Sequence, residues 1–194
     1  MNYIFNNNLK VGDVILTNSI AINDILKSKI QKFFTKGNYT HTILYIGQNR
    51  FIEADSGGVS IFPITDISFH KKENIKIIRY KNYTELVHLE DKIYNLSTQK
   101  YNYMNYNFEG IRAFIKLAKP HNKKVFCSEL VTKIYEDINI KLFNIESHKI
   151  TPAHYESSNS FFDITNICLD EVYNLPTTIS KIYDMNKMTN KIAY

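Results

Sequence analysis

Apolar residues along the chain fall into short β-rich runs and into longer stretches with helical spacing. The run THTILYIGQNRFIEA at 40–54 is divided by turn residues at 47–50, which is the pattern of a β-hairpin. Residues 9–18 predict a turn at Gly12 and Asp13 that leads into a short strand. Further strands are predicted at 58–62, 75–80 and 125–126.

Apolar residues spaced three and four positions apart predict helices in the remaining stretches. These predicted helices cover residues 20–36, 84–97, 108–118 and 127–138. The segment beyond 150 has a mixed pattern and predicts no single element. Since strands and helices are interleaved, and no repeat or Pro/Gly-rich linker divides the chain, we expect one α+β domain over residues 1–194.

Composition narrows the class of protein. The 194 residues are 44% hydrophobic and 13% aromatic, which excludes a disordered chain. No stretch approaches the roughly 18–20 apolar residues of a membrane span, and the first residues do not resemble a secretory signal. Two cysteines exclude a disulfide framework. Together these features predict a cytoplasmic protein with reduced thiols.

The basic excess carries little functional information. Lys and Arg together number 24 against 19 acidic residues, which gives a formal charge of +5. Only three of the 24 are Arg, and the abundant Lys accompanies other residues with A/T-rich codons. A protein that binds the phosphates of nucleic acid is expected to use the bidentate guanidinium groups of Arg as well as Lys. The composition therefore argues against nucleic acid as a partner.

Cys127 is the residue most suggestive of chemistry. It stands where the strand-like Val125 and Phe126 give way to the predicted helix. A helix N-terminus stabilises a thiolate, and its free N–H groups can hold an oxyanion. A small buried hydrophobe is the alternative interpretation of a lone Cys. Cys168, within DITNICLDEV, has no such setting and is interpreted as structural.

A thiolate nucleophile needs an imidazole and a third polar group to orient it. His41 begins the first strand of the hairpin, while the remaining histidines are His70, His88, His121, His148 and His154. Glu53 follows 12 residues after His41, with Asp55 as a rival. A two-residue loop would put Glu53 on the face opposite His41, whereas a three-residue loop or a one-residue bulge would put both on one face.

Six segments occur in an order that matches a known family: VGDVIL (11–16), QKFFTKGNYTHTILYIG (31–47), RFIEADSGGVSIFPI (50–64), QKYNYMNY (99–106), VFCSELVTKIY (125–135) and ITPAHYESS (150–158). With them the chain resembles the circularly permuted papain-like, or permuted NlpC-type, cysteine enzymes of the YiiX/YaeF-like branch. Lecithin retinol acyltransferase-like and H-rev-type proteins are more distantly similar. The resemblance covers residues 9–158, and the tail 159–194 is expected to pack on this core or to be peripheral.

This resemblance implies a permuted papain-like fold, in which a small, barrel-like antiparallel sheet packs against helices and the His strand precedes the Cys helix. It implies that Cys127 is the nucleophile, His41 the general base and Glu53 the third residue of the site. It also makes Tyr101 a candidate for binding the oxyanion, although Asn102 stands where the family usually has Asp. Ser128 is a further candidate for contact with the substrate or the oxyanion.

The expected activity is thiol-dependent acyl hydrolysis or transfer, on a peptide or isopeptide amide or on a lipid acyl group. The Lys-bearing amphipathic segments 20–36 and 108–118 would also suit an anionic membrane surface, although ordinary core packing with a solvated Lys face is the favoured interpretation of both. Two alternatives are an inactive binding module of the same fold and an N-acyltransferase acting on an amine. No cofactor is implied, and no C-x-x-C or H-x-x-x-H spacing suggests a metal.

Overall fold

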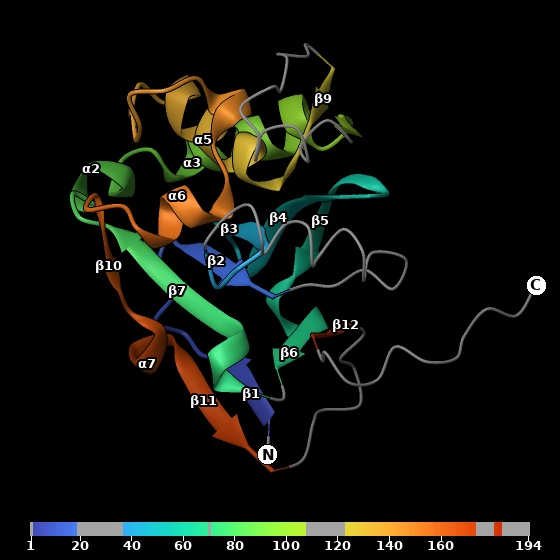
Figure 1. The fold of residues 1–194 in the computed structure, drawn as a ribbon, viewed down its shortest axis with the longest axis vertical. Coiled ribbons are helices and arrows are strands. Elements are labelled where there is room, and N and C mark those ends of the chain that lie inside the picture. Colours follow the sequence, from blue (N-terminus) through green and yellow to red (C-terminus); the bar gives the residue numbers. More distant parts are fainter. Residues whose placement is uncertain (1, 19–36, 70, 108–122, 174–180, 184–194) are drawn as a thin grey trace, which may run out of the picture.

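The structure is a computed structural model, and it describes residues 2–18, 37–69, 71–107, 123–173 and 181–183. Its main feature is a six-stranded sheet in which every neighbouring pair is antiparallel, in the order β10-β7-β2-β3-β4-β5 (Figure 1). The strands are β2 (Val14–Thr17), β3 (His41–Gly47), β4 (Arg50–Asp55), β5 (Gly58–Pro63), β7 (Ile75–Tyr80) and β10 (Phe161–Asp163).

Strands β3 and β4 form the predicted hairpin. Gln48 and Asn49 have φ of 50° and 55°, the left-handed conformation that a tight two-residue hairpin turn requires. The register then shifts between Tyr45 and Gly47, because a β-bulge places one extra residue in β3. Of the two geometries open to the sequence, the structure therefore has the bulged one.

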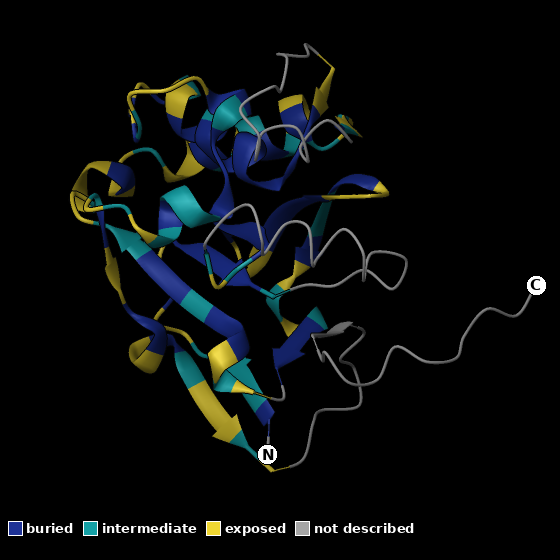
Figure 2. Ribbon diagram, in the orientation of Figure 1, coloured by how far each residue is buried: buried dark blue, intermediate teal, exposed yellow. Residues whose placement is uncertain are grey.

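One long helix packs against this sheet. Helix α5 (Cys127–Asp137) follows the short strand β9 (Lys124–Val125) and buries eight of its side chains, including Leu130 and Ile134. It packs most closely against β3, and it also contacts the segment Ser147–Lys149 and β4. The helices α2 (Thr84–Val87), α3 (Glu90–Asn95) and α6 (Pro152–Glu156) lie at the same end of the molecule (Figure 1). Figure 2 shows α5 and the central strands in the colour of buried residues.

A second, four-stranded sheet ties both ends of the described chain together in the order β11-β1-β6-β12. These strands are β1 (Asn2–Phe5), β6 (Ile67–Phe69), β11 (Leu169–Val172) and β12 (Lys181–Tyr183). The ring of Phe5 stacks edge-on against Phe51 of the first sheet at 4.9 Å between ring centroids. Residues of the tail thus pair with the first strand of the chain, and β10 pairs with β7.

The chain is an α+β protein. Strands β2, β3, β4, β5, β7 and β9 fall on the predicted β-rich runs, whereas β1, β6, β10, β11 and β12 were not predicted. The predicted helix 84–97 is instead divided into α2, α3 and a π-helical segment, Leu96–Tyr101. The division lets Leu86 pack over Gly12, whose φ of 89° and lack of a Cβ make room for it. Short elements complete the fold: η2 (Ile64–Asp66), η3 (Lys72–Asn74), β8 (Asn105–Tyr106), η5 (Ser147–Lys149) and α7 (Thr165–Cys168).

The predicted helices 20–36 and 108–118 lie outside the described residues. None of the helices that the structure describes is long and apolar enough to cross a bilayer.

An ion pair between the buried Asp13 and the partly buried Arg79 fixes the start of β2. Asp13 receives two hydrogen bonds of 2.7 Å from Arg79 on β7 and a third from the backbone N–H of Lys10. Arg79 also donates to the carbonyl oxygen of Asn8. The Gly-Asp turn predicted from the sequence is therefore held by a bidentate guanidinium–carboxylate pair, which anchors two strands of the sheet to each other.

Candidate active site

The β-bulge brings His41 and Glu53 to one face of the sheet. Because Ile43 pairs with Glu53, the side chains at 41, 43 and 53 point in the same direction. The Nε2 atom of His41 lies 2.9 Å from Oε2 of Glu53, and both side chains are buried. The rival carboxylate, Asp55, is exposed and accepts a hydrogen bond from the N–H of Gly57 instead.

Cys127, on the helix that packs against the sheet, is the third residue of the site. It is the first residue of α5, and Phe126 before it is in the extended conformation typical of an N-cap. The thiol is buried and hydrogen-bonds the imidazole of His41. Since Nε2 of His41 faces Glu53, Nδ1 is the nitrogen left for the sulfur. The structure therefore brings together the three residues that the sequence singled out.

The electrostatics of the site favour an ion pair. Burial by itself would lower the pKa of His41, but the Cys127 thiolate and the Glu53 carboxylate outweigh it and raise that pKa to about 10. Burial would likewise raise the pKa of Cys127, yet the positive charge and hydrogen bond of His41, helped by Thr42, lower it. A thiol that transfers its proton to this imidazole becomes a nucleophile at neutral pH.

Thr42 is the site residue that the sequence did not single out. Its backbone N–H and its hydroxyl both lie close enough to the Cys127 sulfur to lower the pKa of the thiol. A β-branched residue inside HTILYIG looks like any other strand former, so its type and position carried no functional signal. Only the placement of α5 against the start of β3 shows its proximity to the thiol.

The structure does not bring Tyr101 to the thiol. Its hydroxyl donates to Asp137 at 2.7 Å, and Asp137 lies ten residues further along α5, which is about 15 Å of helix. Tyr101 also lines a cavity of about 680 Å³, together with Lys133 and Asp137 among others. Cys127, His41 and Glu53 are not among the residues that line this cavity. The assignment of Tyr101 to oxyanion binding is therefore corrected, because Asp137 holds its hydroxyl at the other end of the helix.

The side chain of Ser128 is also engaged elsewhere. Its hydroxyl donates to the carbonyl oxygen of Ile150 at 2.8 Å, and the residue is fully buried. It thereby ties the beginning of α5 to the segment that precedes α6. What Ser128 could still offer the chemistry is its backbone N–H in the first turn of the helix, not its hydroxyl.

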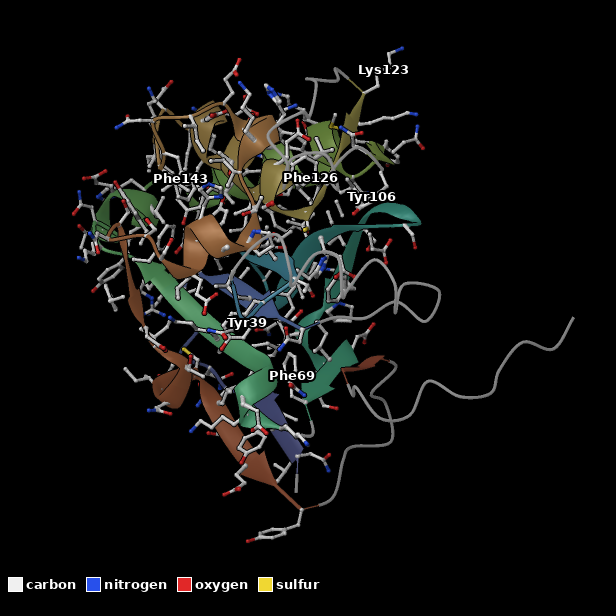
Figure 3. All side chains as sticks on the ribbon, viewed as in Figure 1. Tyr39, Phe69, Tyr106, Lys123, Phe126 and Phe143 are labelled. Atoms are coloured by element: carbon white, nitrogen blue, oxygen red, sulfur yellow. The ribbon has the colours of Figure 1, made fainter. Side chains whose placement is uncertain are left out.

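Two further groups line the region around the sulfur. Tyr155 of α6 is buried close enough to Cys127 for a thiolate there to raise the pKa of the phenol, in addition to the larger effect of burial. Its hydroxyl lies 2.8 Å from that of Thr132. On another side, Phe126 packs with Tyr106, which also contacts the main core, and Figure 3 shows these two side chains beside the start of α5.

The described histidines other than His41 make different contacts. His154 caps α6 by accepting from the N–H of Thr151, His148 lies 3.8 Å from Glu146, and His88 is exposed at the end of α2. His70 and His121 lie outside the described residues. In the described ranges, no three His, Cys, Asp or Glu side chains are grouped as a metal ion would require.

A model of the family described as permuted papain-like amidase enzyme, YaeF/YiiX, C92 family matches residues 8–187. The matched range contains the hairpin, α5 and most of the tail. None of the curated proteins compared with the chain matches it significantly.

Proposed function

The chain belongs to the permuted papain-like amidases of the YaeF/YiiX, C92 family, and on that premise we propose that it cleaves an amide bond with Cys127 as nucleophile, His41 as general base and Glu53 as the residue that orients the imidazole. The family match supports amidase activity and a cysteine hydrolase. The assignment of the three roles is our proposal, supported by the geometry of the site.

The observation that carries the proposal is the unbroken contact from sulfur to carboxylate. The Cys127 thiol hydrogen-bonds His41, and His41 bonds Glu53 at 2.9 Å, all of them buried. A buried carboxylate next to an imidazole is costly unless it is paired, so this arrangement favours a protonated His41 beside a thiolate. A nucleophile, a base and an orienting acid in that order form the constellation of covalent acyl transfer.

The reaction would proceed in two halves. The thiolate of Cys127 attacks the amide carbonyl carbon, and the carbonyl oxygen takes up the negative charge. His41 gives its proton to the departing amine as the C–N bond breaks, which leaves an acyl thioester on the sulfur. A water molecule, deprotonated by His41, then attacks the thioester; the acid is released, and the thiol proton returns to the Cys127–His41 pair.

The start of α5 supports the developing oxyanion. The N–H groups in the first turn of a helix have no partner within the helix, and the helix dipole favours negative charge there. The N–H of Cys127 itself is therefore the donor that we propose for the oxyanion, in place of the Tyr101 hydroxyl. We propose a peptide or isopeptide amide as the substrate, because the match is to amidases and the reaction requires no lipid contact.

The test separates the two cysteines by chemistry. An iodoacetamide-alkyne probe at pH 7 should label the wild type and the Cys168→Ala variant equally, and it should not label Cys127→Ala. A panel of aminoacyl-aminomethylcoumarin amides with the matching p-nitrophenyl esters should give turnover only with Cys127 in place. If a folded Cys127→Ala variant hydrolyses any amide of the panel at the wild-type rate, the proposal is wrong.

A further inference from the structure

The start of β3 leaves one backbone donor outside the sheet. Along an antiparallel strand, successive N–H groups point to alternate sides. The N–H of Tyr45 donates to Asp13 on the β2 side, so the N–H of Thr42, three positions earlier, points to the β4 side. Within the described ladder, the pairing of β3 with β4 extends only as far as Ile43 and Glu53. In place of a β4 carbonyl, the N–H of Thr42 faces the sulfur of Cys127.

The hydroxyl of Thr42, like its backbone N–H, lacks a partner in the sheet. Thr42 has no exposed surface, and its Oγ1 has no hydrogen-bond partner among the described residues, the sulfur of Cys127 included. A buried hydroxyl without a partner is destabilising, so such a group is informative when a reactive atom lies next to it. The neighbour that the structure provides is again the Cys127 sulfur, an acceptor that gains strength when it is ionised.

The geometry points to Thr42 as a residue that holds the thiolate at two points: once the sulfur of Cys127 is ionised, the N–H and the Oγ–H of Thr42 both donate to it and keep it anionic and in position opposite His41. This inference rests on the proposed role of Cys127 as the nucleophile. It adds to the site a residue that neither transfers a proton nor orients the imidazole. It also gives the buried hydroxyl of Thr42 the acceptor that it otherwise lacks.

The other groups around the sulfur do not take over this role. His41 on β3 supplies the positive charge, and Glu53 on β4 acts on the imidazole. The hydroxyl of Thr132 donates to the carbonyl oxygen of Ser128, so the hydroxyl of Tyr155 on α6 donates to Thr132, not to the sulfur. On α5 itself, Glu129 is paired with Lys133 at 3.0 Å.

The chain offers a matched control in Thr17. Thr17 lies on the neighbouring strand, paired with His41, and is also fully buried with a hydroxyl that has no hydrogen-bond partner in the described structure. Replacing either threonine by valine removes one hydroxyl and leaves the shape almost unchanged. Only at position 42 does that hydroxyl neighbour the thiol.

The experiment measures the rate of alkylation of Cys127 by iodoacetamide from pH 5 to pH 10 in the full chain. We expect Thr42→Val to move the midpoint of this profile upward by about one pH unit, since a hydrogen bond to a charged group accounts for a shift of that order. Thr42→Ser, which keeps both donors, should restore the wild-type midpoint. Thr17→Val should also keep it, and thermal unfolding should show that all variants are folded.

The inference is overturned if Thr42→Val alkylates with the same midpoint as Thr42→Ser, or if Thr17→Val shifts the midpoint as far as Thr42→Val does. Failure of the proposed function has a different signature, because the wild type itself would then lack a thiolate at neutral pH or would keep its turnover without Cys127. If Thr42→Val does not fold, Thr42→Ala and Thr42→Ser form the pair to compare, and equal midpoints in that pair overturn the inference as well.

Discussion

The two cysteines of this chain are both free and buried, yet their surroundings have opposite effects on the thiol. Burial raises the pKa of Cys168, the last residue of α7, to about 11, with Asp13 adding to the rise and Arg79 opposing it. Burial acts on Cys127 in the same direction, but His41 and Thr42 reverse the outcome and lower the pKa. Burial alone makes a cysteine inert, whereas a matched set of partners makes it reactive.

The difference originates in how the nearby charges are paired. Asp13 and Arg79, the charged groups near Cys168, are satisfied by each other in a bidentate pair, so their effects on that thiol largely oppose one another. Near Cys127, Glu53 is bonded to an imidazole that still has a second nitrogen for the sulfur. Asp13 and Arg79 neutralise each other and serve as a structural anchor. The charge of a protonated His41 is balanced fully only when Cys127 is a thiolate as well as Glu53 a carboxylate.

The largest effect should come from removing one thiol at a time. Cys127→Ala is expected to lower amide turnover by at least about 10⁴-fold, because no other group can form the thioester. Cys168→Ala should leave turnover within about twofold, with a loss of stability typical of a small core truncation. Steady-state rates with the coumarin amides, together with thermal unfolding, measure both. Loss of turnover in Cys168→Ala without unfolding would contradict the comparison.

Removing the imidazole should make the site of Cys127 resemble that of Cys168. His41→Ala takes away the positive charge and the base, so turnover should fall about 10²- to 10⁴-fold. The pKa of Cys127 should then rise, because burial remains while its counter-charge is gone. Alkylation at pH 7 should become slow and recover only in alkaline solution. Unchanged alkylation at pH 7 in a folded variant would show that the helix, and not His41, activates the thiol.

Neutralising the carboxylate should have a milder effect. Glu53→Gln keeps the size of the side chain but removes the charge that helps to raise the pKa of His41. A fall in turnover of about 10- to 100-fold is expected, from the loss of one charge-assisted hydrogen bond. The alkaline limb of the activity profile should move to lower pH, because the carboxylate no longer helps to raise the pKa of His41. Asp55→Asn, at the exposed turn, is the control and should change neither quantity.

The smallest effect on chemistry is expected at Tyr101. Tyr101→Phe removes the hydrogen bond to Asp137 and should lower the free energy of unfolding by about 1–2 kcal/mol. Turnover should stay within about twofold, because this hydroxyl lies at the far end of α5 from the sulfur. Denaturant unfolding and steady-state rates measure the two effects separately. A large loss of turnover at unchanged stability would show that the Tyr101 hydroxyl does contribute to the reaction.

Much of the site could be predicted because it depends on local patterns. The hairpin follows from β-rich runs around a turn, and the helix start at Cys127 follows from a short strand that gives way to helical spacing. The face of Glu53 could not be fixed in the same way. It depends on a one-residue bulge between Tyr45 and Gly47, and the sequence is compatible with either register.

The remaining parts depend on contacts between distant segments. Strand β1 was not predicted, and it forms by pairing with β11, more than 160 residues later in the chain. Whether Tyr101 faces the sulfur or Asp137 is decided by how the π-helical segment packs along α5. Thr42 likewise resembles any other strand residue until β3, β4 and α5 are assembled. Local propensity carries no information about any of these arrangements.

The most direct test of the central claim follows alkylation of both cysteines in one sample. Peptide mass spectrometry would follow the iodoacetamide modification of Cys127 and Cys168 from pH 5 to pH 11. We expect a midpoint for Cys127 well below the ordinary thiol value of about 8.5 and a midpoint for Cys168 above it, near 11. Equal midpoints, or a Cys127 that reacts only in alkaline solution, would contradict it.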